Sequence, residues 1–355
     1  MTESEHQASV LARRERAGLY DFRGLTPFSR FGTASDRYAG WIGQIYPSDY
    51  AERVRGRRRK LGGNTYTEET VPVDSVAHYF EHFDVLELDF TFYRPLLEKD
   101  GRPGSNLNVL RKYADHAPDG AKFFLKAPQT YFLPKLRKGS PAVYVDNEDY
   151  LNAEACHSHF VDPAVRVLGD RLLGLVFEQS YTRQAEGPSP EDNVREMAQF
   201  FDDLGDRVQA HVELRSPHLL VDPYFDWLAA SGIGFVFSHW SWLPPLREQW
   251  RMAGERFTAA DKNVVCRLLT PLRMSYANAY ALSHPFDAPQ PEISESAGGR
   301  RMVLDATALA FQGLKQDYTV NLILNNRAWG NSPALAQEIT DRILEEEIRR
   351  FNAEE

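Results

Sequence analysis

The stretch Leu172–Leu214 decides the fold, and it reads LLGLVFEQSYTRQAEGPSPEDNVREMAQFFDDLGDRVQAHVEL. It starts with the apolar run Leu172–Phe177 and ends with Gln209–Leu214, and both have the length of a buried strand. Between them, Pro190–Leu204 repeats apolar residues at helical spacing, and Gly205 is a helix stop. The apolar face of that helix consists of Val194, Met197, Phe200, Phe201 and Leu204. The stretch therefore predicts a strand, a crossover helix and a second strand.

The same alternation of strand and helix continues along the whole chain. The predicted strands are Ser29–Ala34, Val85–Asp89, Lys122–Lys126, Leu172–Phe177, Gln209–Leu214, Gly234–Ser238, Val264–Leu268 and Val320–Leu324. Further helices are predicted at Pro72–Phe83, Pro223–Ala230 and Pro333–Phe351. Eight strands alternating with helices predict an α/β fold of the TIM (β/α)8 type, a parallel barrel inside a ring of helices.

Residues 1–27 are polar and are expected to form an N-terminal extension outside the core, so that residues 28–355 form a single domain. The chain is longer than the roughly 250 residues typical of this barrel. Long loops at Phe92–Asp119, Pro128–Ala164 and Met274–Arg300 are expected to account for the excess. A doubly wound open sheet is the alternative, but no G-x-G-x-x-G follows a predicted strand.

Composition excludes several classes of protein. The 355 residues are 43% hydrophobic and 26% charged, which excludes wholesale disorder, and the net charge of −9 opposes nucleic acid as a general partner. Cys156 and Cys266 are too few for a zinc cluster or a disulfide scaffold. No stretch approaches the roughly 20 apolar residues of a membrane span. These features predict a cytoplasmic protein without a membrane partner.

Every predicted strand ends in polar side chains, at the end of a parallel barrel that carries the working residues. In strand order they are Thr33 and Ser35, Glu87 and Asp89, Lys126, Glu178 and Gln179, Glu213 and Arg215, His239 and Trp240, Arg267, and Asn325 and Asn326. Alternate residues of a strand share a face, so Glu213 and Arg215 are expected to point the same way. Ionised groups inside a barrel cost several kcal/mol unless they are paired or liganded. We therefore expect either a shared polar pocket or a structural ion network in which Lys126 pairs with Glu87, and Glu213 with Arg215 or Arg267.

Several short motifs occur in a fixed order over about 300 residues. They are Gly32-Thr33 with Trp41-x-Gly43-x-x-Tyr46-Pro47, Glu87-x-Asp89-x-Thr91-Phe92-Tyr93-Arg94, Phe124-x-Lys126-Ala127-Pro128, Glu178-Gln179, Val212-Glu213-Leu214-Arg215, and Asn325-Asn326 before Gly330. This set resembles the YecE-like proteins, a family built on a domain of unknown function (domain 72). The resemblance implies a TIM barrel related in shape to xylose isomerase and endonuclease IV, with no assigned reaction.

The sequence departs from the family pattern in three places. Position 89 more usually holds Asn, whereas this chain has Asp89; the sixth strand ends in Ser238-His239-Trp240 rather than an acidic element; and Gln179-Ser180-Tyr181-Thr182 replaces Q-L-P-P. These changes weigh against transferring a substrate from the wider family.

A site for a small anionic or sugar-phosphate-like ligand is the leading interpretation of the barrel mouth. Glu87 and Glu213 are the predicted catalytic acid and base if the protein is an enzyme, and Lys126, Arg215 and Arg267 are the predicted charge-binding residues. Asp89, Tyr93, Glu178, His239, Asn325 and Asn326 complete the predicted ligand-binding set. The sequence does not decide between an enzyme and a ligand sensor, and it names no cofactor.

The same mouth offers residues for two other chemistries. Glu87, Asp89, Glu178, Glu213 and His239 are of the types that bind divalent metals, but three cations would oppose a metal ion, so no metal ligand is predicted. A standard glycosidase is disfavoured because the seventh strand offers Arg267 rather than a carboxylate.

The basic run Arg53–Lys60 (RVRGRRRK) supports the alternative function, a nucleic-acid-binding or metal-dependent phosphodiesterase-like barrel. A solvated helix or loop face without neighbouring aromatic rings is the structural expectation for this run, and nucleic acid is the less favoured partner.

Overall fold

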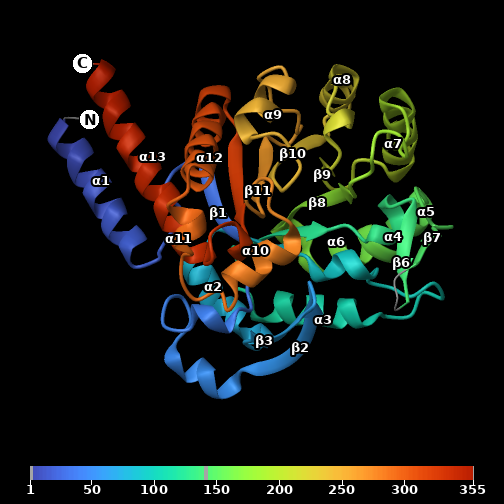
Figure 1. The fold of residues 1–355 in the computed structure, drawn as a ribbon, viewed down its shortest axis with the longest axis horizontal. Coiled ribbons are helices and arrows are strands. Elements are labelled where there is room, and N and C mark those ends of the chain that lie inside the picture. The colour runs from blue at the N-terminus through green and yellow to red at the C-terminus, as the bar shows by residue number, and fades with distance from the viewer. Residues whose placement is uncertain (1–2, 140–142, 355) are drawn as a thin grey trace.

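A computed structural model gives the structure of the protein and describes residues 3–139 and 143–354. Eight parallel strands close into a barrel in the order β1, β12, β11, β10, β9, β8, β5, β4 (Figure 1). Their bounds are β1 Ser29–Ala34, β4 Val85–Leu88, β5 Lys122–Lys126, β8 Leu172–Gln179, β9 Ala210–Leu214, β10 Gly234–His239, β11 Asn263–Leu268 and β12 Thr319–Leu324. The predicted barrel and its eight strands are confirmed.

Three strand ends at the mouth differ from the prediction, and one of them is that of β10, which extends to His239 instead of ending at Ser238. Strand β4 ends at Leu88, so Asp89 lies just beyond the strand. Strand β8 continues to Gln179 because Glu178 and Gln179 still pair with Glu213 and Leu214 of β9. Glu178 is therefore a strand residue that shares the pairing register of Glu213.

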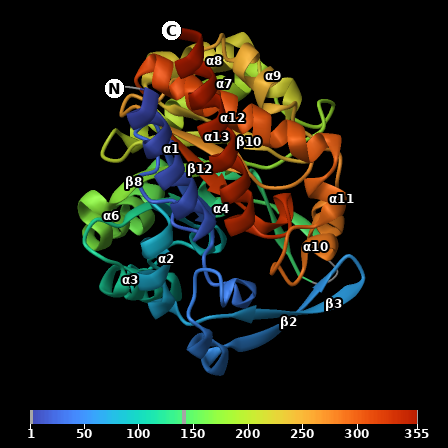
Figure 2. The same cartoon turned by 90° about the vertical axis from the view of Figure 1, so that its left-hand side faces the viewer.

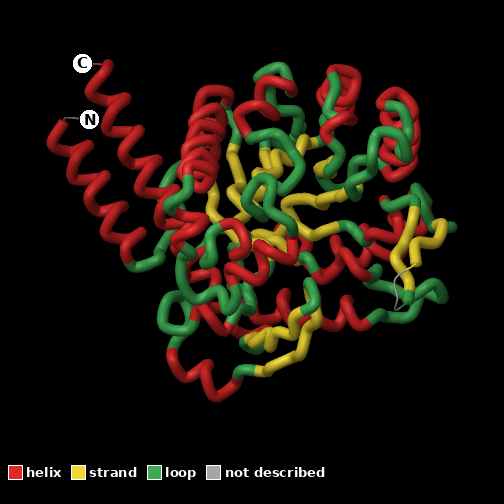
Figure 3. Tube along the Cα trace, in the orientation of Figure 1, coloured by secondary structure: helices red, strands yellow, loops and turns green. Residues whose placement is uncertain are grey.

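Helices surround the barrel (Figure 3). Their bounds are α1 Glu3–Gly18, α2 Val76–His82, α3 Ser105–His116, α4 Gln129–Phe132, α5 Ala153–Cys156, α6 Asp162–Leu168, α7 Pro190–Leu204, α8 Asp222–Ser231, α9 Leu246–Met252, α10 Tyr276–Ser283, α11 Pro291–Ser294, α12 Ala297–Gln316 and α13 Ser332–Glu354. Helix α12 was not predicted, because glycines at 298, 299 and 313 weaken the helical signal of its sequence. Ser296 caps this helix by accepting a hydrogen bond from the Gly299 amide at 2.9 Å.

The three long segments that we expected to be loops contain regular structure. Phe92–Asp119 holds α3, Pro128–Ala164 holds α4, α5 and the hairpin of β6 (Lys135–Lys138) and β7 (Val143–Asp146), and Met274–Arg300 holds α10 and α11. The basic run was also misassigned, because it lies largely in a two-stranded antiparallel hairpin of β2 (Arg55–Leu61) and β3 (Asn64–Thr70).

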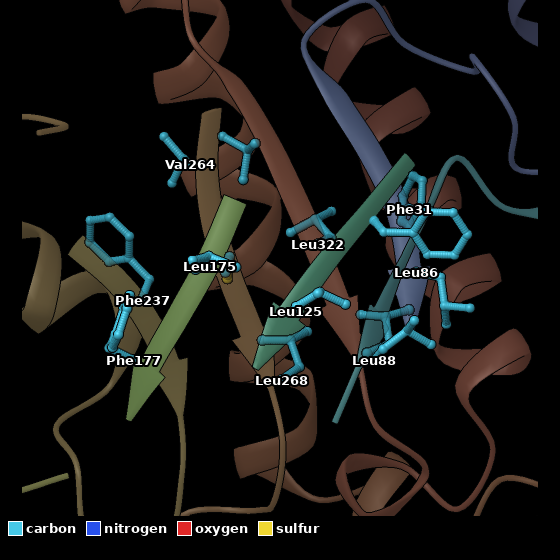
Figure 4. Packing of buried hydrophobic residues seen from close by; sticks show 14 of the residues in the cluster. Phe31, Leu86, Leu88, Leu125, Leu175, Phe177, Phe237, Val264, Leu268 and Leu322 are labelled. Carbon is cyan, nitrogen blue, oxygen red and sulfur yellow. The ribbon is translucent and has the colours of Figure 1, made fainter. Parts of the chain in front are cut away.

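Successive side chains of a barrel strand point alternately to two apolar clusters, one between the strands and the helices and one inside the barrel. Outward side chains such as Phe31, Leu125, Leu175 and Phe237 pack toward the helices (Figure 4). A second buried cluster combines Ala34, Val85, Phe124, Val176, Val236, Val265 and Ile323. Residues two positions further along a strand point the same way, so the polar groups that follow these residues form the next layer toward the mouth.

The N-terminal segment packs on the barrel domain rather than lying apart from it. Helix α1 runs beside α13 (Figure 2), and Arg13 forms an ion pair with Glu347 at 2.5 Å. Ala17, Phe22 and Leu25 belong to the main buried cluster. The expectation that residues 1–27 lie outside the core is therefore wrong for its last part, because these apolar side chains cover the outer face of the barrel.

Candidate functional site

Six charged side chains that the sequence predicted from separate strands meet in one buried network. Arg267 of β11 donates to Glu87 of β4 at 2.7 Å and to Glu213 of β9. Arg215 follows β9 and lies 2.8 Å from Glu178 of β8 and 3.1 Å from Glu213. Lys126 of β5 lies 2.5 Å from Glu178. Four of the six lie two positions after Val85, Phe124, Val176 and Val265 on the same strands, so they form a charged layer next to the inner apolar cluster.

The lower part of this network is sealed from solvent. Glu87 and Glu213 are 0% exposed and Arg267 is 3% exposed. Burial raises the pKa of Glu87, although the charges of Arg267 and Lys126 oppose that rise. Burial would lower the pKa of Arg267, but Glu213, Glu87 and Glu178 together raise it, so the guanidinium stays charged. Glu87, Glu213 and Arg267 therefore lie together in the structure, and the two carboxylates are bound by the arginine.

The upper part of the network converges on Glu178. Its Oε2 atom lies within 4 Å of three cations, namely Lys126, Arg215 and, at 3.6 Å, Arg267. Burial alone would raise the pKa of Glu178, but Arg215, Lys126 and Arg267 hold it well below its usual range. Three carboxylates balance three cations. This arrangement is that of a structural ion network, which is one of the two alternatives expected from the sequence.

Aromatic rings flank the upper cations. The guanidinium of Arg215 lies 4.8 Å from the centroid of the Trp240 ring, and the ammonium of Lys126 lies 3.9 Å from that of Phe92. The Phe92 ring contacts the ring of Tyr93 edge-on at 5.6 Å. Tyr93 is 67% exposed and connects the network to a neighbouring cleft.

This cleft has a volume of about 1400 Å³ and lies beside the ends of three adjacent strands. Its walls come from the segments after β1, β4 and β12, from the β2–β3 hairpin and from α10. Of the predicted residues, Asp89 and Tyr93 line it, whereas the six-member ion network does not. The Ser35 hydroxyl donates to Asp89 Oδ1 at 2.6 Å and fixes that carboxylate at the wall of the cleft.

Arg327 is a residue of the cleft that was not predicted from the sequence. Its guanidinium lies 4.4 Å from the centroid of the Tyr276 ring, and among the residues that the structure describes it has no ion-pair partner. Its buried Nε atom also lacks a hydrogen-bond partner there. The available signal was its place directly after Asn325-Asn326 at the end of the eighth barrel strand.

The two predicted asparagines hold the backbone that carries Arg327. Asn325 accepts a hydrogen bond from the Arg327 amide at 3.1 Å. Asn326 Oδ1 accepts from Trp41 Nε1 at 3.2 Å and from the Ser332 amide at 2.7 Å. Both residues are buried, so their described contacts are internal ones that shape the loop after β12.

His239 lies at the end of β10, where its Nδ1 is 2.8 Å from the Thr270 carbonyl oxygen. Burial lowers the pKa of His239 to about 4, against the effect of that backbone contact, so the imidazole is neutral near pH 7. No group of three or more His, Cys, Asp or Glu side chains in residues 3–139 and 143–354 is placed to hold a metal ion.

The basic run lies at the rim of the same cleft, and aromatic rings do lie beside it, contrary to the sequence expectation. Arg59 lies 5.8 Å from the Tyr276 ring and 5.2 Å from the Tyr280 ring. These tyrosines are more than 200 positions away in the chain, which is why the neighbourhood of the run in sequence did not reveal them. Within the described part of the chain, no helix is both long and apolar enough to cross a membrane.

One solved structure of the DUF72 family has a similar fold. The crystal structure of a DUF72 family protein from Thermotoga maritima is 15% identical, covers 90% of this chain and 99% of its own, and superposes with a TM-score of 0.50. An endo-β-mannanase/endo-β-glucanase from Prevotella bryantii is 11% identical over 77% of this chain and 44% of its own, with a TM-score of 0.47. No curated protein matches the chain. The family model described as protein of unknown function DUF72 matches residues 30–354, and the chain therefore belongs to the DUF72 family.

Proposed function

We propose that the protein binds a small anionic, sugar-phosphate-like ligand in the cleft at the C-terminal mouth of the barrel. The observation that carries the proposal is Arg327, a cation at the cleft wall that no described carboxylate neutralises. Arginine suits phosphate because its planar fork can donate two parallel hydrogen bonds. The Tyr276 ring beneath the guanidinium restricts its motion, and this lowers the entropy cost of binding.

Two further cleft residues fit the sugar part of such a ligand. Asp89 has one oxygen committed to Ser35, and its carboxylate is suited to accept hydrogen bonds from sugar hydroxyl groups. The exposed ring of Tyr93 offers an apolar face on which a sugar ring can pack. Cation, carboxylate and aromatic ring therefore supply one contact for each chemical feature of a sugar phosphate.

The ion network has a supporting role in this proposal. Glu87, Glu213 and Arg267 are too buried to touch a ligand in the cleft, so we assign them to holding the strand ends in register. Lys126 and Arg215 are engaged with Glu178, which leaves Arg327 as the better phosphate-binding residue. The proposal concerns binding and assigns no reaction, so it covers both an enzyme and a ligand sensor.

The test is a calorimetric comparison of glucose 6-phosphate, inorganic phosphate and glucose on the wild-type protein and the variants Arg327→Met and Tyr93→Ala. We expect glucose 6-phosphate to bind more tightly than either fragment. Arg327→Met should weaken the phosphate-bearing probes by about tenfold or more, as for loss of a charged hydrogen bond. Tyr93→Ala should weaken glucose 6-phosphate and leave inorganic phosphate unchanged.

The matched control is Arg111→Met, which removes one exposed arginine of α3 outside the cleft. Equal affinities for Arg327→Met and the control would refute the assignment of Arg327. Failure of the wild-type protein to bind either phosphate-bearing probe at millimolar concentration would refute the proposed function.

A further inference from the structure

The basic run reaches the cleft as one strand of a hairpin that is fixed in place. Arg59 donates from Nη1 to Glu68 Oε1 at 2.6 Å and from Nη2 to the Tyr276 hydroxyl at 3.0 Å. The Tyr280 hydroxyl donates to the same Glu68 oxygen at 3.1 Å. On β3, the ring of Tyr66 packs against that of Tyr280 with centroids 4.9 Å apart. One arginine of the run thus anchors the hairpin to α10.

The other cations of the hairpin have no such partner. Arg57, Arg58 and Lys60 are exposed and line the cleft, and none of them forms an ion pair with a residue in the described ranges. Register places Arg58 opposite Thr67 and Lys60 opposite Thr65, which are neutral residues. Arg57 faces Glu68, but that carboxylate is already bound by Arg59.

The charge of the cleft also has the opposite sign to that of the chain. Seven basic side chains line it against five acidic ones, an excess of two positive charges, whereas the whole chain carries −9. Burial also raises the pKa of one of the acids, Asp36, to about 6, which reduces its negative charge in mildly acidic solution. A local positive field in a negative protein favours ligands with several negative charges.

The size of the cleft also favours a ligand with more than one phosphate group. A volume of about 1400 Å³ exceeds the roughly 300–1,000 Å³ typical of small-ligand sites, so a sugar monophosphate at Arg327 would leave the hairpin end unfilled. The unpaired hairpin cations line this same cleft, on its hairpin wall.

We propose that the ligand of this cleft carries two or more phosphate groups, one held by Arg327 and the next by the hairpin cations Arg57, Arg58 and Lys60. This inference rests on the proposed function and narrows its ligand class to compact polyphosphorylated molecules. The hairpin, anchored through Arg59 and Glu68, is the element that selects for the second phosphate.

A phosphate ladder tests the inference without requiring the natural ligand. Dissociation constants are measured for inorganic phosphate, pyrophosphate and tripolyphosphate in buffer without divalent cations. Attraction between solvent-exposed charges about 4 Å apart corresponds to about fivefold in affinity, so each added phosphate should bind about fivefold or more tightly. The gain should shrink as salt rises from low to physiological concentration.

Two matched triple variants locate the effect. Arg57→Gln, Arg58→Gln and Lys60→Gln are combined in one protein, and Arg111→Gln, Lys112→Gln and Lys315→Gln in the other. All six residues are exposed, and the second set lies outside the cleft. Both variants lose three positive charges, so net charge alone affects them equally. We expect the hairpin variant to lose the gain in affinity of the longer probes over inorganic phosphate, whereas the control keeps that gain.

Three outcomes would overturn the inference. They are equal affinity of the wild-type protein for all three probes, equal loss in the two triple variants, and tighter binding of an eight-residue oligothymidylate than of tripolyphosphate, which would indicate an extended nucleic-acid strand instead. The proposed function fails separately, when neither inorganic phosphate nor glucose 6-phosphate binds or when Arg327→Met leaves their binding unchanged. If phosphate binding depends on Arg327 but the affinity does not increase from inorganic phosphate to tripolyphosphate, only the present inference is wrong.

Discussion

Arg267 donates a hydrogen bond to Glu87 at 2.7 Å across the interior of the barrel, although 180 positions separate the two residues in the chain. The same guanidinium also binds Glu213, so one arginine of β11 links carboxylates of β4 and β9. None of the three side chains is exposed by more than 3%, so water does not stabilise their charges. The arginine and the two carboxylates stabilise one another instead.

Replacing the central cation should destabilise the fold strongly. Arg267→Met leaves Glu87 and Glu213 as buried carboxylates without their main partner, and breaking a buried pair in this way costs about 3–5 kcal/mol. Urea unfolding at pH 7 measures the loss, with Arg111→Met as the exposed control. Adding Glu87→Gln and Glu213→Gln to Arg267→Met should restore part of the stability. A loss no larger than that of the control would contradict the view that the network is held together by Arg267.

Glu178 should contribute stability that disappears in acid. Despite its burial, the charges of Arg215, Lys126 and Arg267 hold its folded pKa below the unfolded value of about 4.5. A depressed carboxyl pKa stabilises the folded protein above the unfolded pKa, and this contribution is lost as the pH falls through and below 4.5. The difference in unfolding free energy between wild type and Glu178→Gln should therefore be largest near pH 7 and should decrease steadily below pH 4.5. Glu15→Gln, at an exposed position of α1, is the control, and a constant difference between wild type and Glu178→Gln would argue against an ionised Glu178.

The strands and the inward direction of their charged residues could be predicted from sequence, whereas the pairing of charges could not. Apolar runs of strand length locate the barrel, and the period of two places Glu87, Lys126 and Glu213 on inward faces. Pairing depends on the depth at which each residue enters the barrel, which is set by the register between neighbouring strands. Lys126 consequently meets Glu178 rather than Glu87.

The cleft could not be predicted from the sequence either, but for a different reason. Arg59 and Arg327 both lie close to the ring of Tyr276, and these three residues come from a hairpin, the segment after β12 and a helix that are distant in the chain. None of these segments shows a hydrophobic periodicity in its sequence that would fix its position. Only the closure of the barrel brings the ends of β1, β4 and β12 together and gives these segments a common wall.

Asp36 should have the opposite pH dependence to Glu178. Its carboxyl is buried, which raises its pKa from 3.8 to about 6, although the Tyr113 hydroxyl donates to it at 2.7 Å and favours the charged form. A raised carboxyl pKa means that the folded state holds the proton more tightly, so stability falls as the pH rises from about 4 to 6. Asp36→Asn removes this dependence, so its unfolding free energy relative to wild type should rise by about 2 kcal/mol between pH 4 and pH 7. Denaturant unfolding at both values checks this, with the exposed Asp115→Asn as control, and parallel curves would contradict it.

His211 should explain the need for glycine at position 234. The imidazole is fully buried among the barrel strands, neither ring nitrogen has a hydrogen-bond partner among the described residues, and burial lowers its pKa to about 3. A Cβ atom on Gly234 would lie 2.1 Å from His211 Nδ1, closer than any real contact. Gly234→Ala should therefore cost about 1–3 kcal/mol through overpacking.

A double-mutant cycle separates this clash from a general cost of alanine at position 234. His211→Ala removes the ring, so Gly234→Ala should cost much less in that background, with a coupling energy of about 1 kcal/mol or more from urea unfolding. Gly298→Ala on α12, where the nearest atom would be 3.7 Å away, serves as the uncrowded control. If Gly234→Ala were equally costly with and without the ring, the requirement for glycine would lie in the backbone of β10. The close fit of the His211 ring against Gly234 would then not be the reason why glycine occupies this position.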